Sequence, residues 1–303
     1  MQFKRVKRAI DGVLLLDKPL GLSSNQALQQ VKRLYQAAKA GHTGSLDPLA
    51  SGLLPICLGE ATKFSHFLLD ADKSYRALVK LGSTTTTGDV EGEVLSRSEV
   101  DVTQDQLRST LKTFVGQIKQ VPPMYSALKH QGKALYEYAR DGVDIPRAAR
   151  LITIFDIQLN KFEQEAHVFE IDVVCSKGTY IRTLAEDIGH ALGCGAHLAG
   201  LRRLSSAHFR LENALTMEAL EKMSVEERDN ILLSADASII DLPTVELDAD
   251  SAYYLLQGQS IWKSGINIEG LFRIYREDGQ FLGLGELDAD GKVAPKRLLV
   301  MQK

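Results

Sequence analysis

The sequence predicts an α+β protein. We expect a large domain with a central, mostly antiparallel mixed sheet and a cleft across it, followed by a small β domain. Residues 151–159 and 168–175 are apolar runs separated by a short polar stretch, which is typical of antiparallel strands. Amphipathic helical spacing occurs elsewhere, as in residues 102–114. After about Thr244 glycine punctuates short apolar runs, and a chain of 303 residues has room for two unequal domains.

The N-terminal elements follow from local patterns. Residues 12–17 are apolar and end at Lys18-Pro19, which predicts a buried strand that runs into a turn. Ser23 or Ser24 can cap the next helix. The elements predicted after it are a helix at 61–69, a strand at 74–82 and a loop at 84–89.

A second helix is predicted after the strand at 168–175. Gly178 suits a tight turn, and Thr179 can cap a helix that continues to about Leu192. This places Tyr180 and Arg182 in the first helical turn, where the helix dipole favours anions. We therefore expect Arg182 to have a specific acidic partner, although an isolated arginine is more often a surface residue.

The remaining C-terminal sequence contains shorter signals. Residues 200–204 are expected to precede a strand, and residues 216–241 show helical patterning. Leu242-Pro243 predicts a linker. Beyond it, Asp278-Gly279 and Asp290-Gly291 lie between short apolar runs and predict hairpin turns.

The octapeptide GHTGSLDP at residues 41–48 predicts a shaped loop that presents one acid. Its two glycines permit backbone conformations that a side chain would forbid, and Pro48 pushes Asp47 towards an extended conformation. The same residue types also form ordinary turns. The loop lacks the Gly-Lys-Ser/Thr of a phosphate-binding loop, and His42 with Asp47 supplies too few ligands for a metal.

Composition indicates a cytoplasmic protein without a membrane segment. No apolar run reaches the roughly 20 residues that cross a bilayer, and the basic N-terminus lacks the apolar core of a secretory signal. Three scattered cysteines predict buried, reduced thiols (Cys57, Cys175 and Cys194). The net charge is −3, but residues 212–250 carry eleven acids against two bases, a net of −9, so the rest carries +6 and can form a basic face.

Residues 122–150 combine aromatic and basic side chains. Three tyrosines are interleaved with six lysines, arginines and histidines: Tyr125, Tyr136, Tyr138, Lys129, His130, Lys133, Arg140, Arg147 and Arg150. Such a mixture suits base stacking and phosphate contacts. An ordinary amphipathic helix with solvated lysines explains the pattern equally well.

The chain resembles the TruB family, the bacterial tRNA pseudouridine-55 synthases. The resemblance runs through GHTGSLDPLASGLLPICLGEATKFSHFLLDADKSYRALVKLG, VPPMYSALKHQGKALYEYAR, CSKGTYIRTLAEDIG and GCGAHLAGLRRL, and so covers almost the whole chain. It implies a pseudouridine synthase catalytic domain at 1–243. A mobile thumb at about 122–150 and a PUA-like, β-barrel-like RNA-binding domain at 244–303 are implied as well.

The resemblance also implies roles for particular residues. Asp47 becomes the catalytic nucleophile, Arg182 its ion-pair partner that keeps the carboxylate ionised, and Tyr75 a proton acceptor or relay that lies against the target base. His42, Tyr180 and Leu201 become substrate-binding residues, with Leu201 an apolar wall of the uracil pocket. Without the resemblance, Tyr75 and Leu201 fit an ordinary strand tyrosine and core leucine.

The implied function is isomerisation of uridine 55 in the T-arm loop of tRNA to pseudouridine, on a flipped-out base. No cofactor or metal is expected, and tRNA is the expected partner of a monomer. Attack at ribose C1′, attack at uracil C6 and a glycal-like intermediate all remain open. The alternatives are an RNA-binding or tRNA-folding chaperone module and the catalytic subunit of a guide-RNA pseudouridylation complex.

Overall fold

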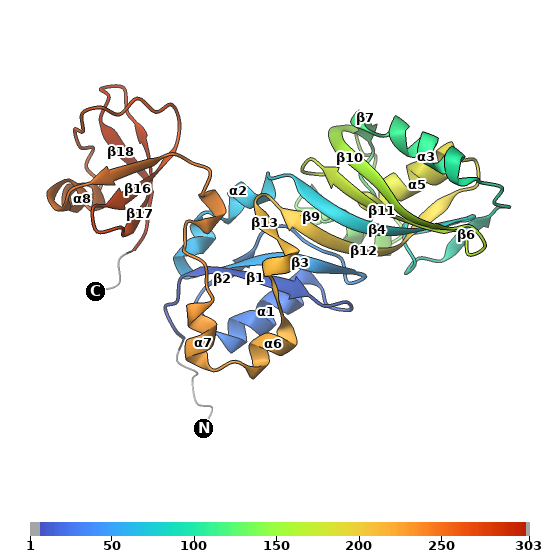
Figure 1. Cartoon of the computed structure of the whole chain (residues 1–303), viewed down its shortest axis with the longest axis horizontal. Helices are drawn as coiled ribbons and strands as arrows, with labels where there is room; N and C mark the ends of the chain where they lie inside the picture. Colours follow the sequence, from blue (N-terminus) through green and yellow to red (C-terminus); the bar gives the residue numbers. More distant parts are fainter. Residues whose placement is uncertain (1–6, 301–303) are drawn as a thin grey trace.

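The computed structural model describes residues 7–300, and its centre is one large mixed sheet (Figure 1). The sheet order is β14 (Leu215–Thr216), β1 (Gly12–Lys18), β3 (Ala50–Leu58), β12 (Ala196–Ser206), β4 (Lys73–Leu81), β11 (Val168–Cys175), β10 (Arg150–Glu163) and β7 (Gly116–Gln120). Two further strands pair off this path, namely β2 (Ala40–His42) with β3 and β13 (Phe209–Arg210) with β12.

The sheet is mostly antiparallel, as the sequence predicts. The predicted pair at 151–159 and 168–175 is the antiparallel β10–β11 pair. Parallel pairing occurs between β1 and β14 and between β3 and β12. The β3–β12 pair lies at the centre of the sheet, where it joins the N-terminal strands to the strands β4, β11 and β10.

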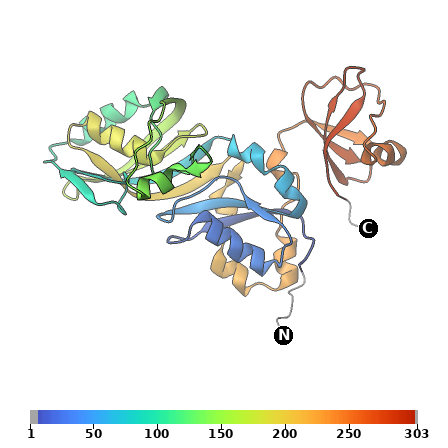
Figure 2. The same ribbon diagram turned by 180° about the vertical axis from the view of Figure 1, so that it is seen from behind.

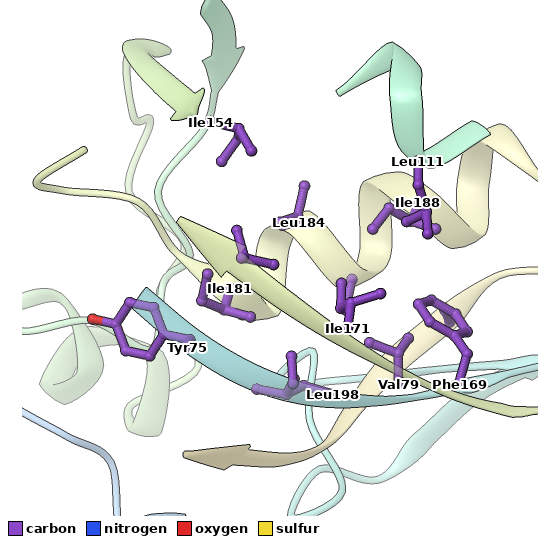
Figure 3. Packing of buried hydrophobic residues seen from close by; sticks show 14 of the residues in the cluster. Tyr75, Val79, Leu111, Ile154, Phe169, Ile171, Ile181, Leu184, Ile188 and Leu198 are labelled. Atoms are coloured by element: carbon purple, nitrogen blue, oxygen red, sulfur yellow. The ribbon is translucent and has the colours of Figure 1, made fainter. Parts of the chain in front are cut away.

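Helices cover one face of the sheet on both sides of this central pair (Figures 1 and 2). Beside β1 and β3, α1 (Ser24–Leu34) and α6 (Met217–Lys222) enclose one apolar core. Beside β4, β11 and β12, α3 (Gln104–Thr113) and α5 (Ile181–Ala191) enclose a second one (Figure 3). Cross-strand register places Ala50 of β3 opposite Leu201 of β12 and Leu201 opposite Ala77 of β4, so both cores lie on the same face.

The other face of β1 and β3 is covered by short elements. They are η1 (Gly59–Lys63), α2 (Ser65–Leu69), η2 (Leu211–Asn213) and η3 (Ala237–Ile239), and α7 (Val225–Asn230) follows α6 in the chain. The single helix predicted at 61–69 is therefore wrong in detail, because a 3₁₀ turn precedes one short α-helical segment. Phe64 between them is buried against the C-terminal domain.

Two predicted helix caps have different outcomes. Ser23 caps α1 in a capping box with Gln26. Thr179 does not cap α5, because its hydroxyl donates to the carbonyl of Ser176, and the N-cap residue is Tyr180. The Gln120 side chain binds the Tyr180 backbone instead, accepting from its N–H and donating to its carbonyl.

Two segments that were not predicted to be strands contain strand residues. Residues 200–204, which were expected only to precede a strand, themselves lie inside β12, and the short strand β13 follows them. The predicted loop at 84–89 begins in β5 (Ser83–Thr85), which pairs with β6 (Val94–Arg97). Residues 122–150 contain only short elements: β8 (Lys129–His130), β9 (Lys133–Ala134) and α4 (Leu135–Arg140). All three cysteines are buried and free.

The C-terminal residues form a separate four-stranded sheet. Its order is β15 (Thr244–Leu247), β16 (Phe272–Arg276), β17 (Phe281–Leu287) and β18 (Val293–Leu298), with α8 (Ala249–Leu256) packed on it. Both predicted hairpin turns are present. A barrel-like domain is expected here, and the sheet is open, because in the described part of the chain the edge strands β15 and β18 do not pair with each other. No helix within residues 7–300 is long and apolar enough to cross a membrane.

Candidate active site

The loop between β2 and β3 carries Asp47 and is held by buried polar contacts. The Ser24 hydroxyl of α1 accepts from the Leu46 N–H at 2.7 Å and donates to the Leu46 carbonyl at 3.1 Å. The Gly21 N–H donates to the Pro48 carbonyl at 2.8 Å. Gly44 has φ +94°, a conformation that a side chain rarely adopts. Asp47 is thus presented by a fixed backbone at the centre of the covered sheet face.

Asp47 forms the ion pair with Arg182 that the sequence predicts. Arg182 Nη2 lies 3.1 Å from Asp47 Oδ2. The Arg182 side chain is 8% exposed, whereas that of Asp47 is 47% exposed. The guanidinium also donates to the carbonyls of Thr87 and Tyr125, at 3.2 Å and 2.6 Å. The pair therefore consists of a buried, fixed cation and a carboxylate that a ligand can reach.

A second carboxylate, Asp89, was not predicted. Its Oδ2 lies 3.4 Å from Arg182 Nη1, and its side chain is 3% exposed. The other oxygen accepts from the Thr87 hydroxyl and from the Glu91 N–H. Asp89 and its partners Thr87 and Glu91 are close neighbours in the chain, and such contacts are typical of an ordinary turn at an aspartate. The local sequence therefore does not indicate that Asp89 also binds Arg182. The arrangement is a chain of three charges, Asp89–Arg182–Asp47, with its buried end closed by hydrogen bonds.

A cavity of about 310 Å³ opens beside Asp47 and contains most of the predicted site residues. Its walls include Tyr75 from β4, Tyr180 from the N-cap of α5 and Leu201 from β12. Figure 3 shows Tyr75 at the end of the apolar cluster, with its hydroxyl directed away from the aliphatic side chains. Burial raises the pKa of both tyrosines, so both phenols are neutral at pH 7.

Three buried cations in or near the cavity, Arg203 and Lys73 in its lining and Lys18 close to Asp47, were not predicted as site residues. Arg203 is 1% exposed and lines the same cavity. Lys18 and Lys73 are also buried, and burial lowers the pKa of each to about 8. The Lys73 ammonium donates to three carbonyls at the end of α2. The alternation of Leu201 and Arg203 along a strand is a sequence signal that could have placed Arg203 on the same face as Leu201.

His42 lies on the opposite side of Asp47, in a second cavity of about 490 Å³. Burial, with a smaller contribution from Arg203, lowers the pKa of His42, so the ring is neutral at pH 7. Its Nδ1 is buried and has no hydrogen-bond partner within residues 7–300. This cavity is also lined by Tyr136 and Arg140 of the 122–150 segment. His42 therefore lines the cavity that adjoins the tyrosine cavity, and Asp47 and Arg182 line both.

Within residues 7–300, no group of three or more His, Cys, Asp or Glu side chains is arranged to hold a metal ion. The polar groups of the site are one reachable carboxylate, neutral tyrosines and buried cations. They suit an uncharged aromatic ring with carbonyl groups, attached to an anionic chain. Nucleophilic attack by a carboxylate is the chemistry that this arrangement supports.

Comparisons with known proteins define the class. Family models match three successive parts of the chain: "TruB family pseudouridylate synthase (N terminal domain)" at residues 32–181, "tRNA pseudouridylate synthase B C-terminal domain" at 182–239 and "Pseudouridine synthase II TruB, C-terminal" at 243–299. The chain is similar to the chain matched in a Cbf5-Nop10-Gar1 complex, with TM-score 0.71 and 27% identity over 95% of this chain and 84% of that one. The fold is that of a pseudouridine synthase, and the family models place the chain in that class.

Curated relatives narrow the class. The chain is 72% identical over 299 residues to tRNA pseudouridine synthase B of Methylobacillus flagellatus, covering 99% of this chain and 98% of the relative. It is 51% identical over 313 residues to tRNA pseudouridine synthase B of Vibrio vulnificus, covering 100% and 99%. The chain belongs to the TruB family of pseudouridylate synthases, as the sequence predicts.

Proposed function

We propose that this enzyme isomerises uridine 55 in the T-arm loop of tRNA to pseudouridine, with Asp47 as the nucleophile. The observation that carries the proposal is the reachable Asp47 carboxylate, paired with buried Arg182 at the edge of a base-sized cavity. The full-length similarity to proteins named tRNA pseudouridine synthase B supports the substrate. Identity of 72% to such a protein, against 27% to the chain from the Cbf5 complex, favours a stand-alone enzyme over a guide-RNA complex.

The reaction breaks the N1–C1′ bond of uridine and joins the ribose to C5, while N1 gains a proton and C5 loses one. A folded RNA loop hides the base, so the target nucleotide must first leave its stack. In the 310 Å³ cavity the uracil would lie between Leu201 and the aromatic residues Tyr75 and Tyr180. Asp47 forms the covalent bond, and Arg182 keeps its carboxylate ionised and directed into the cavity.

The C5 proton is removed by Tyr75 or by a water molecule that Tyr75 positions. Burial favours the neutral phenol, so a relay fits Tyr75 better than a resting phenolate base. His42 is also neutral and serves in placing RNA on the other side of Asp47. An uncharged imidazole there can donate or accept a hydrogen bond without repelling a base.

RNA binding outside the cavity would use two further regions. Residues 122–150 form a thumb that closes over the T arm, and Tyr136 and Arg140 already line the cavity beside His42. Residues 244–303 form a small PUA-like RNA-binding domain, separate from the catalytic domain at 1–243. The exposed Arg297 side chain and the partly exposed Lys263 side chain in this domain suit phosphate contacts. The enzyme acts as a cytoplasmic monomer.

The test is pseudouridine formation on a transcribed T-arm stem-loop, comparing the native protein with Asp47→Asn and with Asp241→Asn. Asp241 is an exposed acid at the start of the linker and serves as the matched control. We expect product at position 55 with the native and Asp241→Asn proteins, and none with Asp47→Asn. Binding without product from the native protein would instead support an RNA-folding module. Turnover by Asp47→Asn at the native rate would refute Asp47 as the nucleophile.

A further inference from the structure

Arg203 is the largest fully buried side chain of the described chain, and it is charged. Within residues 7–300 no carboxylate forms an ion pair with it, whereas Arg182 and Arg202 each pair with an aspartate. A buried charge without a counter-ion is expensive, so such a residue is retained where its charge or its donors are needed. Arg203 also lines the cavity that contains Tyr75 and Leu201.

Backbone contacts hold the Arg203 guanidinium in one place. Its Nε donates to the Leu53 carbonyl at 2.6 Å, and Nη2 faces the Gly44 carbonyl at 3.4 Å. On β3 the residue opposite Arg203 is Gly52, whose φ is +100°. A Cβ on Gly52 would lie 2.4 Å from the Arg203 carbonyl oxygen, so this close strand approach requires glycine. The guanidinium is thereby fixed below the Asp47 loop.

Tyr75 is the residue opposite Arg203 on the neighbouring strand, β4. Directly opposed residues in an antiparallel pair project from the same face of a sheet. The Tyr75 hydroxyl points away from the apolar cluster (Figure 3), and Tyr75 and Arg203 line the same cavity. Burial has the largest effect on the pKa of Tyr75 and raises it, whereas the Arg203 guanidinium acts to lower it. A guanidinium carries donors and no acceptor, so the Tyr75 oxygen can only accept from Arg203. The phenolic proton is then directed elsewhere.

We propose that Arg203 is a positioning residue that orients the Tyr75 hydroxyl to donate into the base cavity, towards a carbonyl oxygen of the flipped uracil. This inference rests on the proposed function. It adds that Tyr75 is the donor, and the uracil the acceptor, in the hydrogen bond between them. Tyr75 then enters the reaction as a neutral donor that holds the base. A water molecule held in the same cavity receives the C5 proton.

The first test reads the Tyr75–Arg203 contact directly and needs no turnover. 3-Fluorotyrosine placed at position 75 of the full chain is followed by fluorine NMR during a pH titration. In Arg203→Gln we expect the fluorine resonance to move and the phenol pKa to rise, because a nearby positive charge is lost. Arg203→Lys keeps the charge and should give a smaller rise.

The neighbouring residue supplies the matched control. Arg202 projects from the opposite face of β12 and pairs with Asp17, its Nη2 lying 2.6 Å from Asp17 Oδ2. Arg202→Gln should leave the Tyr75 resonance and titration unchanged. A Tyr75 titration that is identical in the native, Arg203→Lys and Arg203→Gln proteins would overturn the proposal. If Arg203→Gln does not fold, the comparison of Arg203→Lys with the native protein decides in the same way.

The second test is a double-mutant cycle on single-turnover pseudouridine formation. Arg203→Gln should lower the rate about 10- to 100-fold, the range for a lost hydrogen bond to a charged group, with RNA affinity unchanged. In a Tyr75→Phe background the same substitution should change any residual rate less than about twofold, because its target is gone. An equal loss of single-turnover rate in the native and Tyr75→Phe backgrounds would show that Arg203 acts only through its contacts with the Asp47 loop. If the native protein forms no pseudouridine, the proposed function fails, while the fluorine titration still decides the role of Arg203.

Discussion

The Asp47 loop and the 122–150 segment both border the active-site cavities, but they are held in opposite ways. The loop is anchored by buried groups, including Ser24, Thr43 and Leu46. The 122–150 segment consists of two-residue strands and one six-residue helix, α4, which lies in front of the sheet in Figure 2. A reacting carboxylate needs one geometry, whereas a surface that grips RNA has to adapt to its partner.

The ion pairs of the two regions differ in the same sense. Arg182 lies between two carboxylates, and its own side chain is 8% exposed. In the 122–150 segment, Lys133 pairs with Asp141 at 2.6 Å, but the two side chains are 37% and 60% exposed. Exposed pairs are screened by solvent and contribute little, whereas breaking a buried pair leaves an uncompensated charge. Substitutions in the two regions should therefore have very different consequences.

The largest effect is expected from Arg182→Met, which leaves Asp89 buried without its cation. Single-turnover pseudouridine formation should fall by on the order of 10³-fold or more, because Asp47 loses its orientation and charge partner. The unfolding free energy in urea should fall by about 3 kcal/mol. Lys133→Met is the exposed counterpart and should change stability by less than about 1 kcal/mol. Similar losses for the two variants would remove the contrast between the regions.

Asp89→Asn should have the next largest effect. The amide keeps the shape of the side chain but removes the charge that holds Arg182 from the buried side. We expect about a 100-fold slower single turnover, with the dissociation constant for the T-arm RNA within about twofold of native. Asp144→Asn breaks the exposed pair with Arg147 and should leave turnover unchanged. Weakened RNA binding by Asp89→Asn would show that Asp89 acts on the RNA.

Substitutions at two adjacent serines distinguish the anchoring of the Asp47 loop from the stability of α1. Ser24→Ala removes both contacts to Leu46, and we expect about 2 kcal/mol of lost stability together with about tenfold slower turnover. Ser23→Ala removes only the cap of α1, so about 1 kcal/mol should be lost with turnover nearly native. Thermal unfolding and single-turnover rates check both. Equal rates for the two variants would mean that the Leu46 contacts do not position Asp47.

Arg140→Ala tests the 122–150 segment, where the Arg140 guanidinium lies 5.3 Å from the centre of the Tyr136 ring. The KM for the RNA should rise a few-fold, while kcat stays within about twofold of the native value. The slope of log affinity against log salt concentration should fall by the amount expected for the loss of about one phosphate contact. Stability should change by less than about 1 kcal/mol. A kcat loss as large as that of Asp89→Asn would show that the segment takes part in the chemistry.

The final prediction concerns the pH dependence of stability. Lys73 has a pKa of about 8 in the folded protein, below its ordinary value of 10.5, so between these pH values the unfolded chain binds more protons. Lys73 therefore makes folding more favourable as pH rises through this window, and makes no change below about pH 8. In Lys73→Met this contribution, about 3 kcal/mol for such a difference in pKa, should be absent from urea unfolding measured at pH 8 and pH 10.5. If the unfolding free energy of Lys73→Met depended on pH as it does in the native protein, Lys73 would not have a lowered pKa in the folded state.

Much of the local structure could be predicted from the sequence, because local rules decide it. The cap at Ser23 and the hairpins at Asp278-Gly279 and Asp290-Gly291 depend on a few adjacent residues. The failures show the limit of such rules. Thr179 has the chemistry of a cap, but Gln120, sixty positions away in the chain, binds the start of α5 instead. A small, barrel-like C-terminal β domain was predicted, whereas its sheet is open in the described part of the chain.

By itself, the sequence determined the family, the loop that presents Asp47 and the Asp47–Arg182 pair. Only the tertiary structure brought Asp89 to the buried side of Arg182 and placed Arg203 opposite Tyr75. The physical reason is that glycine, proline and capping preferences act over a few neighbouring residues. The meeting of two charges or hydroxyls, by contrast, depends on strand order and register, and these are set by the packing of the whole sheet.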